Sequence, residues 1–179
     1  EYTVASTSQM LNPVTGDLDA YILDALGLDR DRFGVMIQPG TAVGTLTPQV
    51  QECTGLGPVP VIAVAGHDTG SAVAAVPASD REYAYLSCGT WSLLGVEQNN
   101  AHTSKSALDA GYSNEGSLNK TVRLQINIMG LWMIQQVRHE LDDKYSFVEL
   151  VNMARENPVD YEINVNDQRF LAPENMTAE

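Results

Sequence analysis

The sequence predicts an α/β protein, and two observations carry that prediction. Strand-like and helix-like segments alternate along the chain, an order typical of an α/β domain rather than of a helical bundle or a β-sandwich. Residues 59–65 also form a short apolar run rich in β-branched side chains, which predicts a buried strand. His67, Asp68 and Thr69 follow it directly and precede a run of small, helix-compatible residues, so they lie where α/β proteins bind ligands.

Composition and charge exclude several classes of protein. The 179 residues carry a net charge of -13, with 23 acidic and 10 basic side chains, so no cluster of cations is available for nucleic acid or an anionic membrane. A hydrophobic fraction of 44% supports one domain or two incomplete ones. With no signal peptide and no apolar segment long enough to span a bilayer, we expect a cytoplasmic protein. Cys53 and Cys88 have no CxxC partner, which predicts free, buried thiols and no zinc site, and we assign no metal ligand in the chain.

The first half of the chain contains three predicted elements before the central strand. Weak alternation over residues 2–11 predicts a strand. Apolar residues at helical spacing over residues 18–26 predict an amphipathic helix that ends at Gly27. Thr47-Pro48 predicts the start of another helix, which ends at Gly55.

The pattern changes near residue 80, and we place a domain boundary between residues 79 and 80. Residues 83–88 and 91–96 are two strand-like runs separated by Gly89-Thr90, which predicts a tight hairpin. A Gly-Thr tip can approach a phosphate closely, although such a dipeptide by itself is more often only a turn. Residues 97–117 are predicted to be a long polar loop with a short strand within it, and residues 120–126 are predicted to form another strand.

Two helices are predicted after this strand. The first begins at Asn127 and carries a wide apolar stripe, which places Asn127 and Gln135 about 12 Å apart along one side of it. On local sequence alone, these two are an ordinary N-cap asparagine and an ordinary helical glutamine. Ser146 and Glu149 form a capping box that begins the second helix, and residues 161–165 are strand-like.

Asp68 has two interpretations on local sequence, with about even odds. Its carboxylate either caps the following helix by accepting a hydrogen bond from the N–H of Gly70 or Ser71, or faces a cleft and accepts a proton from a substrate hydroxyl.

Four motifs taken together resemble the FGGY family of carbohydrate kinases over about residues 6–170. They are Gly66-His67-Asp68-Thr69, Ser87-Cys88-Gly89-Thr90-Trp91-Ser92, Asn114-Glu115-Gly116 and Asn127-Ile128-Met129-Gly130-Leu131-Trp132. The resemblance implies an actin-like (ribonuclease H-like) fold with parts of two domains. Residues 1–79 would be the C-terminal part of the sugar-binding N-terminal domain, and residues 80–179 the N-terminal part of the ATP-binding C-terminal domain.

The resemblance also implies roles for individual residues. Asp68 matches the catalytic base, which accepts the proton of the sugar hydroxyl as that hydroxyl attacks the γ-phosphate. His67, Thr69 and Asn127 match positions that contact the sugar. Thr90 and Gln135 match positions on the nucleotide side. The sequence departs from the family pattern at Cys88, Ser117 and Ile126, none of which is a proposed catalytic group.

ATP and Mg²⁺ are the implied cofactors, and a small sugar is the implied partner. Within the family, the Trp132–Gln135 segment favours transfer to O1 of L-rhamnulose. The alternatives are a kinase for another ketose or polyol, such as xylulose, fuculose or glycerol, and a non-catalytic actin-like sugar-binding scaffold. The family's N-terminal phosphate-binding strand pair and later glycine-rich adenosine-binding segment have no counterpart here. We therefore expect this chain by itself not to turn over ATP.

Overall fold

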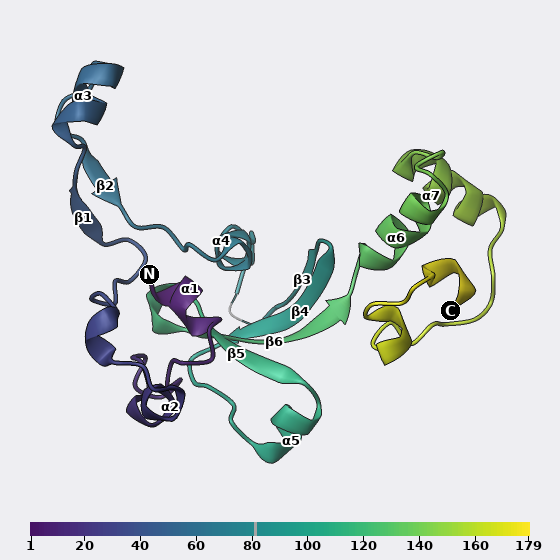
Figure 1. Ribbon diagram of the computed structural model, residues 1–179, viewed down its shortest axis with the longest axis horizontal. Helices are drawn as coiled ribbons and strands as arrows, with labels where there is room; N and C mark the ends of the chain where they lie inside the picture. The colour runs from purple at the N-terminus through teal and green to yellow at the C-terminus, as the bar shows by residue number, and fades with distance from the viewer. Residues whose placement is uncertain (81) are drawn as a thin grey trace. The chain divides into compact units, whose positions relative to one another are not determined.

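The computed structural model describes residues 1–80 and 82–179 (Figure 1), and the chain divides into two units. Unit 1 comprises Glu1–Tyr85 and Gly95–Ile126, and unit 2 comprises Leu86–Leu94 and Asn127–Glu179. The boundary at residues 79 and 80 stays a prediction. The helices are α1 (Tyr2–Ser6), α2 (Ala20–Leu26), α3 (Pro48–Thr54), α4 (Asp68–Ala74), α5 (Lys105–Asp109), α6 (Trp132–Glu140) and α7 (Phe147–Glu156). Short 3-10 helices are η1 (Arg30–Arg32), η2 (Leu118–Lys120), η3 (Gln168–Phe170) and η4 (Met176–Ala178).

Among the described residues, six strands form two sheets. They are β1 (Ala42–Thr45), β2 (Pro60–Ile62), β3 (Ala84–Cys88), β4 (Trp91–Gln98), β5 (Tyr112–Gly116) and β6 (Val122–Met129). Strands β1 and β2 pair antiparallel, and the other four are ordered β3-β4-β6-β5. The β5–β6 pair is antiparallel, with Tyr112 opposite Ile126 and Gly116 opposite Val122. The mixture of helices and sheets agrees with the predicted α/β class.

Helix α1 packs beside β5 in unit 1 (Figure 1). The Tyr2 ring lies so close to Gly116 that a Cβ atom there would overlap it, and Gly116 N donates to Ser6 Oγ at 2.8 Å. Glu1 and Thr3 also anchor the segment before α4: Gly66 N donates to Glu1 Oε2 at 2.9 Å and His67 N donates to Thr3 Oγ1 at 3.1 Å. The N-terminal helix therefore fixes the backbone that carries His67.

Unit 2 has its own core, formed by Met129, Phe170 and Met176 with partly buried side chains of α6 packed against it. Trp132 Nε1 donates to Phe170 O at 3.2 Å. Glu140, on the last turn of α6, accepts hydrogen bonds from Met176 N and Thr177 N. These contacts attach the C-terminal segment to α6.

Predictions that rest on local signals are confirmed. Helices α2 and α3 end at Gly27 and Gly55, each with a left-handed φ. Strands β3 and β4 are consecutive neighbours joined by Gly89-Thr90. The capping box at Ser146 and Glu149 is present and begins α7.

Two predicted strands are wrong. Residues 2–11 begin with helix α1 because the Glu1 carboxylate caps it, accepting from Thr3 N and Val4 N. Residues 161–165 form no strand, and Val165 instead packs on the unit 2 core. Both predictions depended on weak alternation over a short segment, which tertiary contacts readily override.

Two predictions of burial, for the strand at residues 59–65 and for the cysteines, are also wrong. The segment predicted as a buried strand contains β2, but all residues of β1 and β2 are exposed. Strand β2 pairs with β1, and the two form a sheet of only two strands, so this hairpin has little to be buried against. Cys53 and Cys88 are free thiols as predicted, but both are exposed.

The segment around Asn127 is a strand rather than the start of a helix. Strand β6 continues to Met129, and α6 begins at Trp132. The predicted separation of Asn127 and Gln135 along one helix is therefore wrong. The strand signal over residues 120–126 was correct but ended too early.

Within the described part of the chain, none of the helices is both long and apolar enough to cross a bilayer.

Candidate active site

Asp68 is the first residue of α4, and its side chain is 96% exposed. The N-cap of α4 is His67, whose side chain makes no capping hydrogen bond. Asp68 accepts no hydrogen bond from the N–H of Gly70 or Ser71, so the capping interpretation of Asp68 is wrong. Asp68 Oδ1 accepts instead from the adjacent Thr69 N at 2.7 Å and lies 3.5 Å from His67 Nε2. Within residues 1–80 and 82–179, Oδ2 has no hydrogen-bond partner. This carboxylate is free to accept a proton from a bound hydroxyl.

His67 is half-buried and lies among charged groups that sequence reasoning missed. Its Nδ1 is 3.1 Å from Glu115 Oε2 and 3.1 Å from Arg123 Nη2. Arg123 is fully buried on β6, and Glu115 lies on the neighbouring strand β5. Thr69, the third residue of the motif, is buried. Only a charged residue inside the strand-like run at residues 120–126 hinted at Arg123, and Glu115 was noted within a polar loop and a family motif but was given no role.

Thr90 and Gln135 lie in contact within unit 2. Gln135 Nε2 donates to Thr90 Oγ1 at 3.5 Å, at the long limit for a hydrogen bond. Thr90 is exposed and Gln135 is half-buried. The hairpin tip is held by two backbone bonds, from Leu131 N to Gly89 O and from Trp132 N to Thr90 O, each 3.0 Å. Asn127 is exposed on β6.

Gly130 explains how the hairpin tip approaches the start of α6 so closely. A Cβ atom at this position would lie 2.5 Å from Ser92 Oγ and 2.8 Å from Gly89 O. Those distances are far inside van der Waals contact, so glycine permits the two backbone hydrogen bonds. The position of Thr90 therefore depends on a glycine in a different segment.

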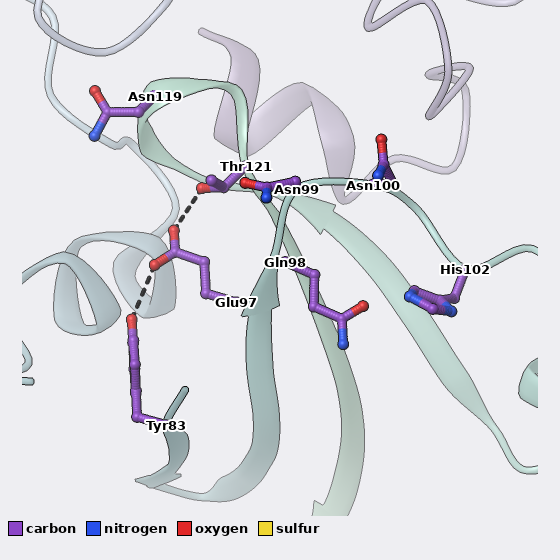
Figure 2. A pocket seen from close by; sticks show the side chains of 8 residues that line it. All are labelled: Tyr83, Glu97, Gln98, Asn99, Asn100, His102, Asn119 and Thr121. Carbon is purple, nitrogen blue, oxygen red and sulfur yellow. Dashed lines mark hydrogen bonds between the residues drawn. The ribbon is translucent and has the colours of Figure 1, made fainter. Parts of the chain in front are cut away.

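A cavity of about 510 Å³ in unit 1 contains none of the predicted site residues (Figure 2). The Glu97 carboxylate at its edge accepts from the hydroxyls of Tyr83, Ser117 and Thr121. Burial alone raises the pKa of Glu97, but these three hydrogen bonds together lower it. Burial, reinforced by Glu97, raises the pKa of Tyr83 to about 12. Three of the roughly four acceptor sites of this carboxylate are therefore used by neighbouring hydroxyls.

Comparison with known proteins identifies the family. Residues 1–75 match the FGGY family of carbohydrate kinases, N-terminal domain. Rhamnulokinase from Bacteroides thetaiotaomicron is 48% identical over 177 residues, which are 98% of this chain and 36% of that protein. The chain belongs to the FGGY family of carbohydrate kinases. Rhamnulokinase from Bacillus subtilis is 42% identical over 180 residues, covering 100% of this chain and 37% of that protein.

Solved structures agree with the actin-like fold expected of an FGGY kinase. The ligand-bound xylulose kinase from Lactobacillus acidophilus superposes with a TM-score of 0.67 at 19% identity, covering 88% of this chain and 32% of that one. The gluconate kinase from the same organism gives the same values. The chain spans little more than a third of the length of the two rhamnulokinases from Bacteroides thetaiotaomicron and Bacillus subtilis.

Proposed function

We propose that the full-length protein transfers the γ-phosphate of ATP to O1 of L-rhamnulose, giving L-rhamnulose 1-phosphate and ADP. The observation that carries this proposal is the 48% and 42% identity to two rhamnulokinases over nearly the whole chain. The free, exposed Asp68 carboxylate at the start of α4 supports it chemically.

In the proposed reaction, Asp68 accepts the proton of the O1 hydroxyl while that oxygen forms a bond to the γ-phosphorus. The bond from that phosphorus to the bridging oxygen breaks, and ADP leaves. His67, Thr69 and Asn127 contact the sugar, and Thr90 and Gln135 contact the nucleotide. Each of these roles is assigned from the family resemblance.

Mg²⁺ is the proposed metal, and we assign none of the described residues as its ligand. No cluster of three or more His, Cys, Asp or Glu side chains suited to a metal occurs among residues 1–80 and 82–179. Mg²⁺ commonly keeps several waters and binds through one or two carboxylates together with substrate phosphates. Asp68 is already proposed as the base, so no carboxylate of the described residues is assigned to the metal, and Mg²⁺ would neutralise phosphate charge when bound.

The test measures ADP release by the full-length protein with L-rhamnulose, xylulose, fuculose and glycerol. We expect the highest kcat/KM with L-rhamnulose, and a preference for another sugar would reject this substrate. Sugar binding without ADP release would instead identify a non-catalytic scaffold.

Asp68→Asn tests the catalytic base in the same assay. Loss of a general base lowers kcat roughly 10²–10⁴-fold, whereas sugar affinity measured by calorimetry should change little. The matched control is Asp24→Asn, which changes an exposed aspartate of α2 and should leave both quantities unchanged. Retained turnover in Asp68→Asn would exclude Asp68 as the base.

A further inference from the structure

Arg123 is a buried cation that contacts several polar groups in unit 1. Its Nη2 lies 3.1 Å from three possible acceptors: Glu115 Oε2, Gly116 O and His67 Nδ1. Its side chain is fully buried, and its Nε and Nη1 atoms have no hydrogen-bond partner in the described part of the chain. Buried donors without partners cost stability, so such a residue in a native structure needs an explanation.

The hydrogen atoms can be assigned by counting donors and acceptors. An arginine only donates, a carboxylate only accepts, and Nη2 carries two hydrogens for the three atoms around it. If these go to Glu115 and Gly116 O, His67 Nδ1 carries a hydrogen and donates to Glu115 Oε2, 3.1 Å away. Glu115 Oε2 and Gly116 O then both accept hydrogen bonds, while the Nη2–Nδ1 pair is left as two donors whose hydrogens point to other atoms.

The opposite assignment is worse. If Nη2 donates to His67 Nδ1, the ring nitrogen presents a lone pair to the Glu115 carboxylate at 3.1 Å. Two acceptors then face each other, and Nη2 is left with one hydrogen for the two remaining acceptors. Of the two neutral tautomers of His67, the local geometry therefore favours the one with its hydrogen on Nδ1.

This tautomer makes His67 Nε2 an acceptor beside the free carboxylate. Nε2 lies 3.5 Å from Asp68 Oδ1, and two acceptors this close do not bond to each other. Together they suit a ligand that brings hydrogen-bond donors, as sugar hydroxyls do.

The guanidinium also lies against the first turn of the helix that carries Asp68. A Cβ atom on Gly70 would lie 3.2 Å from Arg123 Nη1 and 3.5 Å from Arg123 Cζ. Arg123 thus supports both His67 and the start of α4.

We propose that Glu115 and Arg123 are positioning residues for sugar binding. Arg123 holds the Glu115 carboxylate, which keeps His67 in the Nδ1–H tautomer and presents Nε2 as the acceptor for a sugar hydroxyl next to Asp68. The sugar-facing half of this proposal rests on the proposed function, whereas the hydrogen-bond arrangement does not.

The first test is the ¹⁵N NMR spectrum of the histidine rings in the full-length wild-type protein without ligand, with the His67 signals assigned by their loss in His67→Gln. We expect Nδ1 to carry the hydrogen. A hydrogen on Nε2 of the neutral ring would overturn the proposal, and this result depends neither on kinase activity nor on the folding of a positioning variant.

The second test is Glu115→Gln, which keeps the shape of the side chain but removes its charge. We expect the KM for L-rhamnulose to rise about tenfold, kcat and the KM for ATP to stay within twofold, and the His67 ring to become a mixture of tautomers. Glu115→Asp should recover part of the sugar affinity. The control Glu52→Gln, at an exposed position of α3, should change nothing.

The outcomes separate the two proposals. The positioning role would be overturned if Glu115→Gln left the KM for L-rhamnulose unchanged. It would also be overturned if kcat and the affinity for ATP fell by as much as the affinity for the sugar. A wild-type protein that phosphorylates no sugar would defeat the proposed function and the sugar-facing half, while the wild-type NMR spectrum would still decide the tautomer.

Discussion

Replacing Gly130 with alanine should displace the hairpin tip that carries Thr90. The new Cβ would lie 2.5 Å from Ser92 Oγ, 2.8 Å from Ser92 N and 2.8 Å from Gly89 O. The serine side chain can rotate away, but the two backbone atoms can move only with the hairpin itself. The substitution therefore forces the β3–β4 turn away from the start of α6.

The expected cost has two parts. Inserting a methyl group into tightly packed surroundings costs roughly 1–3 kcal/mol. Moving the turn also weakens the hydrogen bonds from Leu131 N and Trp132 N, each worth about 0.5–1.5 kcal/mol. A larger movement of the turn relieves the overlap with the new methyl group but weakens the two backbone hydrogen bonds further. The overlap cost and the hydrogen-bond cost therefore do not simply add. We expect a local destabilisation of about 2–4 kcal/mol.

Amide hydrogen exchange of Leu131 and Trp132 in the full-length protein measures this loss directly. A destabilisation of that size accelerates exchange by roughly one and a half to three orders of magnitude. The KM for ATP should rise as well if Thr90 contacts the nucleotide. The matched control is Gly34→Ala, because Gly34 has no atom near the added methyl group and no left-handed φ. Unchanged protection of both amides in Gly130→Ala would refute this account of the close approach.

Two further predictions concern unit 1 and α7. Because the folded-state pKa of Glu97 is lowered, its contribution to stability is complete above its ordinary value of 4.5 and is lost as the pH falls through the lowered value. Because the pKa of Tyr83 is raised to about 12, its contribution is complete below pH 10 and is lost between about pH 10 and 12. In urea midpoints measured against pH, Glu97→Gln should remove the acid loss and reduce the alkaline loss, because the burial of Tyr83 remains, and unchanged profiles would contradict the network. Ser146→Ala removes the capping box of α7 and should cost about 1 kcal/mol, read from amide exchange in its first turn.

Local signals in the sequence predicted those elements whose cause is itself local. Gly27 and Gly55 end helices because a left-handed φ at those positions depends on the residue alone. The capping box likewise closes within four residues. Gly89-Thr90 joins consecutive strands, so the hairpin could be predicted from neighbouring residues, although the position of its tip depends on Gly130.

Elements defined by distant contacts could not be predicted in the same way. Asn127 precedes a helix-like stripe, yet it lies in β6, a strand placed between β4 and β5 that continues to Met129. The residues of the candidate site likewise divide into those found from local sequence and those that only the fold brings in. His67 and Asp68 stood out as polar residues after an apolar run, whereas Glu115 and Arg123 lie 48 and 56 positions beyond His67. Only the fold brings those two side chains to the His67 ring.

The buried pair of Glu115 and Arg123 permits a separation of stability from function. Replacing a buried ion pair by apolar residues of similar volume is often neutral or stabilising, by about 1–4 kcal/mol. The double variant Glu115→Leu with Arg123→Met also removes the two unpartnered nitrogens of Arg123. We therefore expect it to resist urea at least as well as wild type while its KM for L-rhamnulose rises. If stability and sugar affinity fell together, the pair would be part of the folding core rather than a device for orienting His67.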